Sequence, residues 1–177
     1  KEDQVLLAWT RLIEKEDPDL IIGYNTFGFD FKFLHDRAYE SDCLGTFQVL
    51  SRLRYHRCPL TEYKLRSSAQ GDNSNKYYFQ MPGRIVIDLL RVVQSNYNLT
   101  SYKLDSVCQK FLYKEKVDVT PQELFILQRG TSLDRHRIAV YCLIDCVLCN
   151  RLINKLETIN NSSAMCNVCK VPFSYIF

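Results

Sequence analysis

The sequence has no run of about 18 apolar residues, which a membrane-spanning helix requires, so we expect no membrane partner. Its net charge is only +3, which is too small to indicate nucleic-acid binding by itself. The three histidines, His35, His56 and His136, are not spaced as metal ligands are, so we expect them at the surface or in hydrogen bonds. These absences leave a globular module. With 177 residues and 46% hydrophobic residues, the chain can form one domain with a sizeable core.

Short apolar strands and amphipathic helices alternate along the chain, which predicts an α/β fold. The expected helices cover about residues 5–15, 30–38, 89–97, 103–113 and 132–156, and a short helix begins at Pro121 with Thr120 as its cap. The expected strands cover 20–24 and 84–88, and a further strand includes 77–80. The polar stretch 67–76 predicts a loop between two strands. These strands are too few for a complete sheet.

A carboxylate occupies a face of the last helix that is otherwise uncharged. The face consists of residues at steps of three and four: Ile138, Tyr141, Asp145, Leu148, Leu152 and Leu156. An unpaired buried carboxylate costs on the order of several kcal/mol. We therefore expect Asp145 to meet a cation, a dense set of hydrogen-bond donors or a water-filled cleft.

A second carboxylate follows a strand. The run 20–24 is expected to be a buried strand, a turn that contains glycine follows it, and Asp30 begins the next helix. Asp30 therefore lies beyond the carboxyl end of a strand, where α/β sheets usually bind ligands. The helix dipole alone also favours an acid at a helix N-terminus, and this is the alternative interpretation of Asp30.

Together, Asn25-x-x-x-Phe29-Asp30 and Tyr141-x-x-x-Asp145 resemble the second and third exonuclease motifs of family B DNA polymerases. Segments 17–25, 83–90, 101–107 and 141–145 resemble the same domain in the family's order, and 167–177 is similar to the stretch that leads toward the polymerase palm. The polymerases of large DNA viruses look most similar, followed by the eukaryotic delta type. The resemblance implies an α/β, ribonuclease H-like exonuclease domain of the DEDDy type, with a mixed sheet flanked by helices.

The resemblance also implies a reaction. It is 3′–5′ hydrolysis of the terminal phosphodiester of single-stranded DNA at a site with two divalent ions, Mg²⁺ or Mn²⁺. Asp30 and Asp145 would be metal ligands, since hard oxygen ligands suit these ions. Tyr141 lies one helical turn before Asp145, and its hydroxyl would orient the attacking water.

DNA contacts are implied for Asn25, Phe29, Lys103 and Leu104. Asn25 would tie the turn to neighbouring backbone through its amide, and Phe29 would pack beside the terminal base or beneath the metal site. The simpler interpretations are a turn residue and a core aromatic residue. Lys103 stands where the family commonly has Ser or Thr before the Leu, so it would meet a phosphate as a point charge. Asp88 falls at an acidic position of the family's pattern and is expected to cap the next helix.

The sequence departs from the family in one respect. In the family, a strand upstream of the second motif carries Asp-x-Glu, but no Asp here is followed two residues later by Glu. We therefore expect a fragment that begins after that strand and is inactive alone, cut from a DNA-directed DNA polymerase with proofreading. The expected domains are 1–157, the exonuclease domain incomplete at its N-terminus, and 158–177, the segment leading toward the palm.

The partners implied are single-stranded DNA 3′ ends, primer–template DNA, the remainder of the polymerase chain and a sliding clamp. The implied location is a nuclear or cytoplasmic replication site, in a virus-infected cell if the parent is viral, and not a secreted one. Two alternatives stay open: a catalytically inactive scaffold domain of a replicative polymerase, and a stand-alone DEDDy nuclease. The carboxylates at 30 and 145 disfavour the scaffold, and the polymerase-like stretch 167–177 disfavours the stand-alone nuclease.

A basic stretch is interleaved with tyrosines, with Glu62 as its one acid. Its members are Arg52, Arg54, Tyr55, Arg57, Tyr63, Lys64 and Arg66. Basic side chains can follow phosphates while aromatic faces stack on bases, as in many proteins that bind single strands. A solvated hairpin with ordinary charges accounts for the pattern equally well.

Eight cysteines permit two interpretations. Cys166-x-x-Cys169, or the set Cys142, Cys146 and Cys149, could supply thiolates to zinc. The last three lie in a helix that is otherwise rich in Leu, Ile and Val, so core packing is the favoured interpretation. A disulfide framework is less favoured in a chain of this size. The spacing does not decide whether Cys166 and Cys169 bind a metal.

Overall fold

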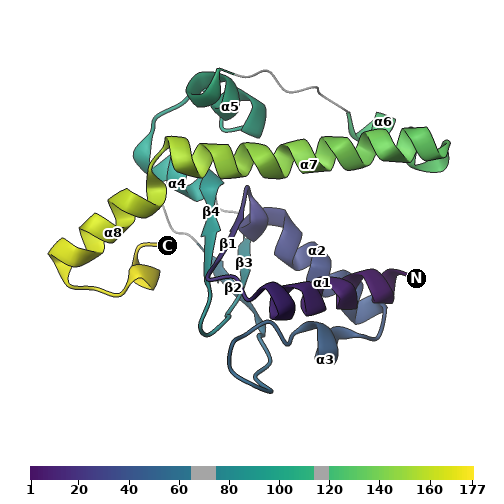
Figure 1. The fold of residues 1–177 in the computed structure, drawn as a ribbon, viewed down its shortest axis with the longest axis horizontal. Coiled ribbons are helices and arrows are strands. Elements are labelled where there is room, and N and C mark those ends of the chain that lie inside the picture. Colours follow the sequence, from purple (N-terminus) through teal and green to yellow (C-terminus); the bar gives the residue numbers. More distant parts are fainter. Residues whose placement is uncertain (65–74, 114–119) are drawn as a thin grey trace. The chain divides into compact units, whose positions relative to one another are not determined.

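The computed structural model describes residues 1–64, 75–113 and 120–177 (Figure 1). The chain forms two compact units, Lys1–Asp88 and Leu89–Phe177, and each is described by itself. The greater part of the predicted loop 67–76 lies outside the described residues.

The first unit mixes helices and strands. Its elements are α1 (Glu2–Glu16), β1 (Leu20–Gly23), the π-helical turn η1 (Thr26–Asp30), α2 (Phe31–Glu40), α3 (Leu44–Phe47), β2 (Leu60–Lys64), β3 (Asn75–Phe79) and β4 (Ile85–Asp88). The strands expected at 20–24 and 84–88 and the helices expected at 5–15 and 30–38 are confirmed, with ends that shift by a few residues. The α/β class is therefore confirmed.

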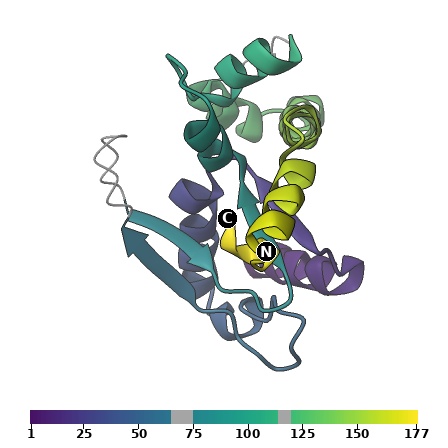
Figure 2. The same ribbon diagram turned by 90° about the vertical axis from the view of Figure 1, so that its left-hand side faces the viewer.

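The strands form two small pairs. β1 and β4 lie side by side (Figure 1) and are parallel, with Leu20 opposite Ile85 and Gly23 opposite Asp88. β2 and β3 form an antiparallel pair (Figure 2), with Leu60 opposite Phe79. Because β1 and β4 are parallel and in register, their carboxyl ends meet at one edge. That edge is where η1 begins.

Aromatic side chains dominate the core of the first unit. The core residues are Leu6, Phe27, Phe31, Ala38, Phe47, Leu50, Cys58, Phe79 and Met81. Phe79 packs edge-on against Phe31 and Phe47, with ring centroids 5.3 and 5.9 Å apart, and Trp9 stacks on Phe47 at 5.6 Å. Such pairs stabilise by about 0.5–1.5 kcal/mol beyond the area that they bury. They join α1, α2, α3 and β3 into one body.

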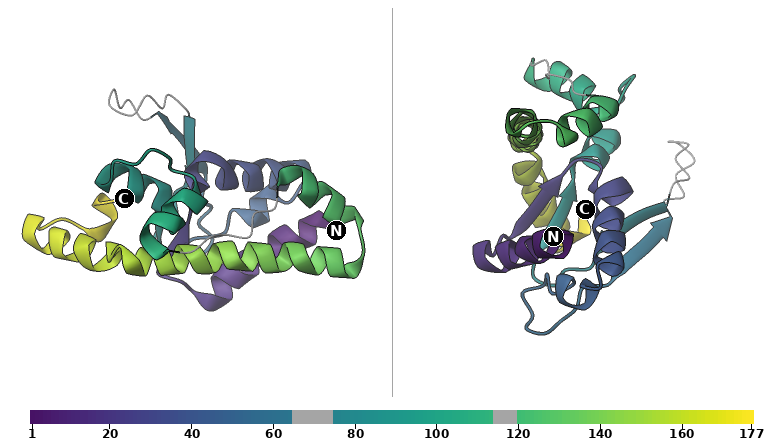
Figure 3. Two further views of the ribbon diagram at one scale, coloured as in Figure 1. Left: turned by 90° about the horizontal axis from the view of Figure 1, so that it is seen from above. Right: turned by 90° about the vertical axis from the view of Figure 1, so that its right-hand side faces the viewer.

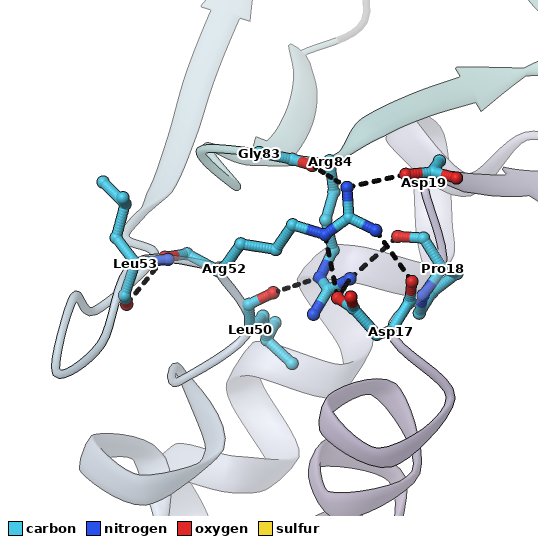
Figure 4. Close-up of polar contacts among 9 residues, drawn as sticks. Asp17, Pro18, Asp19, Leu50, Arg52, Leu53, Gly83 and Arg84 are labelled. Atoms are coloured by element: carbon cyan, nitrogen blue, oxygen red, sulfur yellow. Dashed lines mark hydrogen bonds and ion pairs between the residues drawn. The ribbon is translucent and has the colours of Figure 1, made fainter.

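A buried arginine connects the starts of β1 and β4. The Arg84 side chain is only 3% exposed. Its Nη1 donates to Asp17 Oδ1 at 2.7 Å and to the Pro18 carbonyl at 2.8 Å, and its Nε donates to the Leu50 carbonyl at 2.9 Å (Figure 4). A buried guanidinium is tolerated when its N–H groups are paired in this way.

Arg52 belongs to the same cluster. Its guanidinium donates to Asp17 Oδ1 and to the Asp17 and Gly83 carbonyls, and it pairs with Asp19 at 2.6 Å (Figure 4). Tyr63, another member of the basic stretch, packs edge-on against Phe27 and Tyr78. Arg52 and Tyr63 therefore contribute to the fold, and DNA binding by this stretch stays a prediction.

The rest of that stretch divides between exposed and undescribed residues. Arg54, Tyr55 and Arg57 are exposed. Arg66 lies outside the described residues. His56 and His136 are exposed, and half-buried His35 has its Nδ1 3.3 Å from Asp36 Oδ1, which agrees with the expectation for the histidines.

The second unit is helical throughout its described residues. Its elements are α4 (Leu89–Asn96), α5 (Leu104–Leu112), α6 (Pro121–Arg129), α7 (Ser132–Lys155), α8 (Thr158–Cys169) and the 3-10 turn η2 (Phe173–Tyr175). α5, α6 and α8 all pack against the long helix α7 (Figure 3). The helices expected at 89–97, 103–113 and 132–156 are confirmed, whereas α8 was not predicted.

Two threonines cap successive helices. The Thr120 hydroxyl accepts a hydrogen bond from the Glu123 N–H, and Pro121 occupies the first turn of α6, as predicted. Thr131 has the same reciprocal arrangement with Asp134 at the start of α7. Each cap satisfies N–H groups that the first helical turn cannot pair.

The cysteines divide by position. Cys149 and Cys166 are buried, but Cys142, Cys146 and Cys169 are exposed. The interpretation of the α7 cysteines as core residues is therefore wrong at 142 and 146, because these positions lie off the buried stripe of the helix. All eight thiols are free, and no disulfide forms.

Candidate functional site

The turn that carries Asp30 begins where β1 ends. Asn25, which precedes the π-helical turn η1, adopts the left-handed conformation with φ 61° and ψ 26°. Its carbonyl accepts hydrogen bonds from the Gly28 and Phe29 N–H groups, both at 3.1 Å. Asparagine is among the residues that tolerate this conformation best, so Asn25 redirects the chain from the strand into the turn.

Two glycines allow side chains of the turn to pack closely against the backbone. A Cβ at Gly23 would overlap Thr26 Cγ2, and a Cβ at Gly28 would overlap Asn25 Oδ1. The Asn25 side chain makes no capping hydrogen bond to the turn. The bonds described for Asn25 come from its backbone, and the prediction that its amide ties the turn to neighbouring backbone stays a prediction.

Asp88, the last residue of β4, binds the turn from the neighbouring strand. Its Oδ1 accepts the Asn25 N–H at 2.8 Å and its Oδ2 accepts the Phe27 N–H at 3.1 Å. The residue is only 4% exposed. We expected Asp88 to cap the following helix, and sequence reasoning missed this connection to η1. Carboxylates that accept backbone N–H bonds form short, charge-assisted hydrogen bonds, which are stronger than neutral ones.

Phe27 fixes the other side of the turn. Its ring is buried and packs against Phe31, Tyr63 and Tyr78, with centroid distances of 6.0, 6.3 and 6.4 Å. The turn is thus held by a carboxylate through its backbone and by an aromatic cluster through its side chain.

Asp30 ends the turn and immediately precedes α2. It is an exposed residue that makes no side-chain capping hydrogen bond to the helix. Partial desolvation, together with repulsion by the Asp88 carboxylate, raises the pKa of Asp30 above its ordinary value. Asp30 stands at the N-terminus of α2 without capping it through its side chain, so the dipole interpretation stays open beside the metal-ligand prediction.

Phe29 lies beside Asp30 and is exposed, so its interpretation as a core residue is wrong. Its ring is stacked on that of Phe33, one turn further into α2, with centroids 5.6 Å apart and planes inclined by 13°. Phe29 is 60% exposed and Phe33 is 51% exposed. Two exposed, nearly parallel rings next to a carboxylate form a flat apolar surface, and sequence reasoning did not identify the contribution of Phe33.

In the second unit, α7 carries Tyr141 and Asp145. Both are half-buried and lie one helical turn apart, as predicted. Along the same stripe, Leu148, Leu152 and Leu156 are buried. Asp145 Oδ1 is inaccessible to solvent. The expectation that a carboxylate occupies the buried face of this helix is therefore confirmed.

Lys103 and Leu104 lie at the beginning of α5. Lys103 precedes the helix in extended conformation and is exposed, and half-buried Leu104 is its first residue. The Ser101 hydroxyl accepts a hydrogen bond from the Lys103 N–H at 3.4 Å. Their DNA contacts stay predictions.

The first unit brings together Asn25, Phe29 and Asp30, and the second contains Lys103, Leu104, Tyr141 and Asp145. The meeting of Asp30 with Asp145 concerns both units, and it stays a prediction. Among residues 1–64, 75–113 and 120–177, no three Cys, His, Asp or Glu residues are grouped as a metal site would require. Within the same ranges, no helix has the length and apolar character needed to span a membrane.

Comparison with known proteins identifies the family of this chain. A family model described as DNA polymerase family B, exonuclease domain, matches residues 1–107. The chain is 39% identical to a DNA polymerase of Pyramimonas orientalis virus, with 99% of the chain and 19% of that protein aligned.

Eukaryotic relatives are similar over the same extent. The DNA polymerase delta catalytic subunits of Candida albicans and Glycine max are each 40% identical, with 99% of the chain aligned to 17% and 16% of those proteins. The chain thus spans less than a fifth of the length of these curated relatives. By its sequence, the chain belongs to the exonuclease-domain family of the family B DNA polymerases.

Proposed function

We propose that this chain is the 3′–5′ proofreading exonuclease domain of a DNA-directed DNA polymerase, with the ribonuclease H-like fold. The observation that carries the proposal is the position of Asp30. It follows a rigid turn at the carboxyl ends of two parallel strands, in a chain that belongs to this family. Residues 1–157 would form this domain, and 158–177 would lead toward the palm.

The carboxylate oxygens of Asp30 and Asp145 are suitable ligands for the hard divalent ions Mg²⁺ and Mn²⁺. Both are oxygen ligands, and the raised pKa of Asp30 marks a place where a cation would stabilise the charged form. The described residues contain no complete group of ligands, so further donors are required. Bound there, two divalent ions would lower the pKa of a water and neutralise the leaving oxygen.

Tyr141 is proposed to act on the attacking water. Its side chain lies on the same face of α7 as Asp145, one turn away, so its hydroxyl can hydrogen-bond a water held beside that carboxylate. Its contribution is orientation rather than ligation. Removing the hydroxyl should therefore slow cleavage less than removing either carboxylate.

The proposed substrate is the 3′ end of single-stranded DNA. The stacked rings of Phe29 and Phe33 offer an exposed flat surface next to Asp30, on which a terminal base can stack. Asn25 shapes the turn that presents this surface. Lys103, exposed at the start of α5, and Leu104 would contact the strand, the lysine through a phosphate.

The proposed partners are primer–template DNA, the remainder of the polymerase chain and a sliding clamp. Viral and eukaryotic polymerases are the relatives, so the proposed location is a nuclear or cytoplasmic replication site.

The test is single-stranded DNA hydrolysis by the complete polypeptide that carries this chain, with Mg²⁺ or Mn²⁺. The unaltered polypeptide should shorten a labelled strand from its 3′ end. Asp30→Ala and Asp145→Ala should each reduce the rate by roughly 100-fold or more, because each removes a proposed metal ligand. Tyr141→Phe should reduce it by about 10-fold, and polymerisation should be largely retained in all three variants.

Asp36→Ala is the matched control, since this half-exposed acid of α2 pairs with Lys32 and lies outside the proposed site. Its rate should match that of the unaltered polypeptide. Equal rates for the Asp145→Ala and unaltered polypeptides would contradict the proposal. Absence of hydrolysis by an unaltered polypeptide that polymerises normally would instead favour the scaffold alternative.

A further inference from the structure

Asp88 contacts the turn 25–30 of the proposed site. It lies outside the motif Asn25-x-x-x-Phe29-Asp30 and far from it in sequence. It ends β4 opposite Gly23 of β1, and these two strands lie side by side (Figure 1). At 4% exposed, its carboxylate is among the few charged groups in the interior of the first unit. Burying a carboxylate costs free energy unless hydrogen-bond donors compensate its charge. The donors that it binds therefore indicate its role.

Two partners of Asp88 are backbone N–H groups of the turn. One carboxylate oxygen accepts the Asn25 N–H at 2.8 Å and the other accepts the Phe27 N–H at 3.1 Å. The two donors belong to the residue that starts the turn and to the residue that anchors it in the core. The bond to Asn25 joins positions 63 residues apart in sequence, so it is a tertiary contact.

These bonds limit how the turn can move. Asn25 holds the left-handed conformation, and its carbonyl accepts the N–H groups of Gly28 and Phe29. A shift of Asn25 would therefore be transmitted to Phe29, the residue directly before Asp30. A misplacement of about 1 Å can lower the rate of a reaction by about 100-fold when the reacting groups must be aligned.

We propose that Asp88 is a positioning residue, which holds the turn 25–30 from the neighbouring strand so that the Asp30 carboxylate and the Phe29 ring are correctly placed for cleavage. The proposal rests on the proposed exonuclease function. It assigns Asp88 no contact with DNA and no ligation of an ion, and it rests on the two backbone hydrogen bonds that the carboxylate accepts.

The first test is hydrogen exchange of the complete polypeptide, which requires no catalysis. Asp88→Asn keeps the size of the side chain but replaces one acceptor by a donor, so it should leave the N–H of Asn25 or Phe27 without a partner. We expect amide exchange within residues 25–29 to accelerate by about 10-fold or more, while exchange in α1 stays unchanged. Asp36→Asn is the matched control and should leave residues 25–29 as they are.

The second test measures cleavage of a labelled single strand. Asp88→Asn should lower the rate by roughly 10- to 100-fold and raise the Mg²⁺ concentration needed for half-maximal rate. Because Asp88 acts partly through Asp30, the loss of activation free energy in the double variant Asp88→Asn with Asp30→Ala should be smaller than the sum of the two single losses. Polymerisation by Asp88→Asn should be retained.

The outcomes separate the two proposals. Unchanged exchange in residues 25–29, or additive losses in the double variant, would overturn the positioning role. Exchange that accelerates equally in α1 and in the turn would also overturn it, because Asp88 would then serve general stability. Local acceleration in a polypeptide that cleaves no strand would support the contact while refuting the exonuclease function.

If Asp88→Asn does not fold, the unaltered polypeptide still tests the contact. The amides of Asn25 and Phe27 should exchange at least about tenfold more slowly than in an unstructured peptide. Exchange at the unstructured rate would overturn the proposal.

Discussion

At the scale of single residues, the sequence predicted the elements that carry Asp30 and Asp145, but it did not predict the residues that surround them. Asp30 and Asp145 were predictable because each follows from local pattern: an acid after a short apolar strand, and an acid on an apolar helical stripe. The role of Asp88 was not predictable, since it depends on a strand pairing between distant parts of the chain. The core alternative for Phe29 was wrong, although a bare sequence favours burial for any Phe next to a strand.

The stacked pair gives a prediction at this scale. Phe29→Ala removes one ring from the exposed surface, and stacking of a base on an aromatic ring is worth about 1–3 kcal/mol. Steady-state cleavage of a single-stranded oligonucleotide should therefore show a KM raised roughly 5- to 100-fold, with a smaller effect on kcat. The control is Tyr39→Ala, another exposed aromatic residue of α2 that is not part of the stack. A raised KM for both variants would contradict a specific role for Phe29.

At the scale of elements, most of the helices and strands were predictable and α8 was not. α5 has an apolar face that begins at Leu104 and includes the buried Val107 and Cys108, so its periodicity predicts it. The buried residues of α8 are Thr158, Ser162 and Cys166, which recur every four residues as a helix requires. Because this stripe is small and mostly polar, the hydrophobic pattern gives no signal for a helix there.

The cap of α7 gives a prediction at this scale. Thr131 and Asp134 bind each other reciprocally, with the Thr131 N–H donating to Asp134 Oδ2 at 2.7 Å. Thr131→Ala should destabilise the first turn by about 1 kcal/mol, which corresponds to roughly fivefold faster amide exchange there. The neighbouring Ser132→Ala is the control and should change exchange little. Cleavage should be unaffected, because Asp145 lies about three turns further along α7. A loss of cleavage in Thr131→Ala would show that the cap matters beyond its own turn.

At the scale of the whole molecule, the α/β class and the family were predictable from the sequence. An alternation of strands and helices is enough to indicate α/β. The ordered motifs indicated family B polymerases, which the matched relatives confirm. The meeting of Asp30 with Asp145 was predicted from the resemblance alone and stays a prediction, because long-range packing decides it and no local pattern specifies it.

Acid sensitivity is the prediction for the molecule as a whole. The guanidiniums of Arg52 and Arg84 hold the pKa of Asp17 below its ordinary value of 3.8, and Arg37 lowers the pKa of Glu2 from 4.5. A carboxyl whose pKa is lowered by folding stabilises the native state fully above its unfolded pKa, and this stabilisation is lost as the pH falls through the folded pKa. The first unit should therefore lose stability below about pH 4.

The measurement is amide exchange in residues 84–88 between pH 6 and 3, corrected for the intrinsic effect of pH. The unaltered polypeptide should lose protection as Asp17 is protonated, because buried Arg84 then loses an ionised partner. Asp17→Asn should show weaker protection at pH 6 and a smaller further change on acidification. An acid response unaltered by Asp17→Asn would exclude this carboxylate as its source.

The pairing of β4 with β1 has a consequence for the order of events during synthesis. A ribosome releases the turn 25–30 long before it releases residue 88, yet the turn receives two of its hydrogen bonds from that later residue. Closing so large a loop has an entropic cost that no early contact offsets. We therefore expect a nascent chain that ends before residue 88 to carry the turn in an unfixed conformation, and the turn to be fixed only after β4 has emerged and paired with β1.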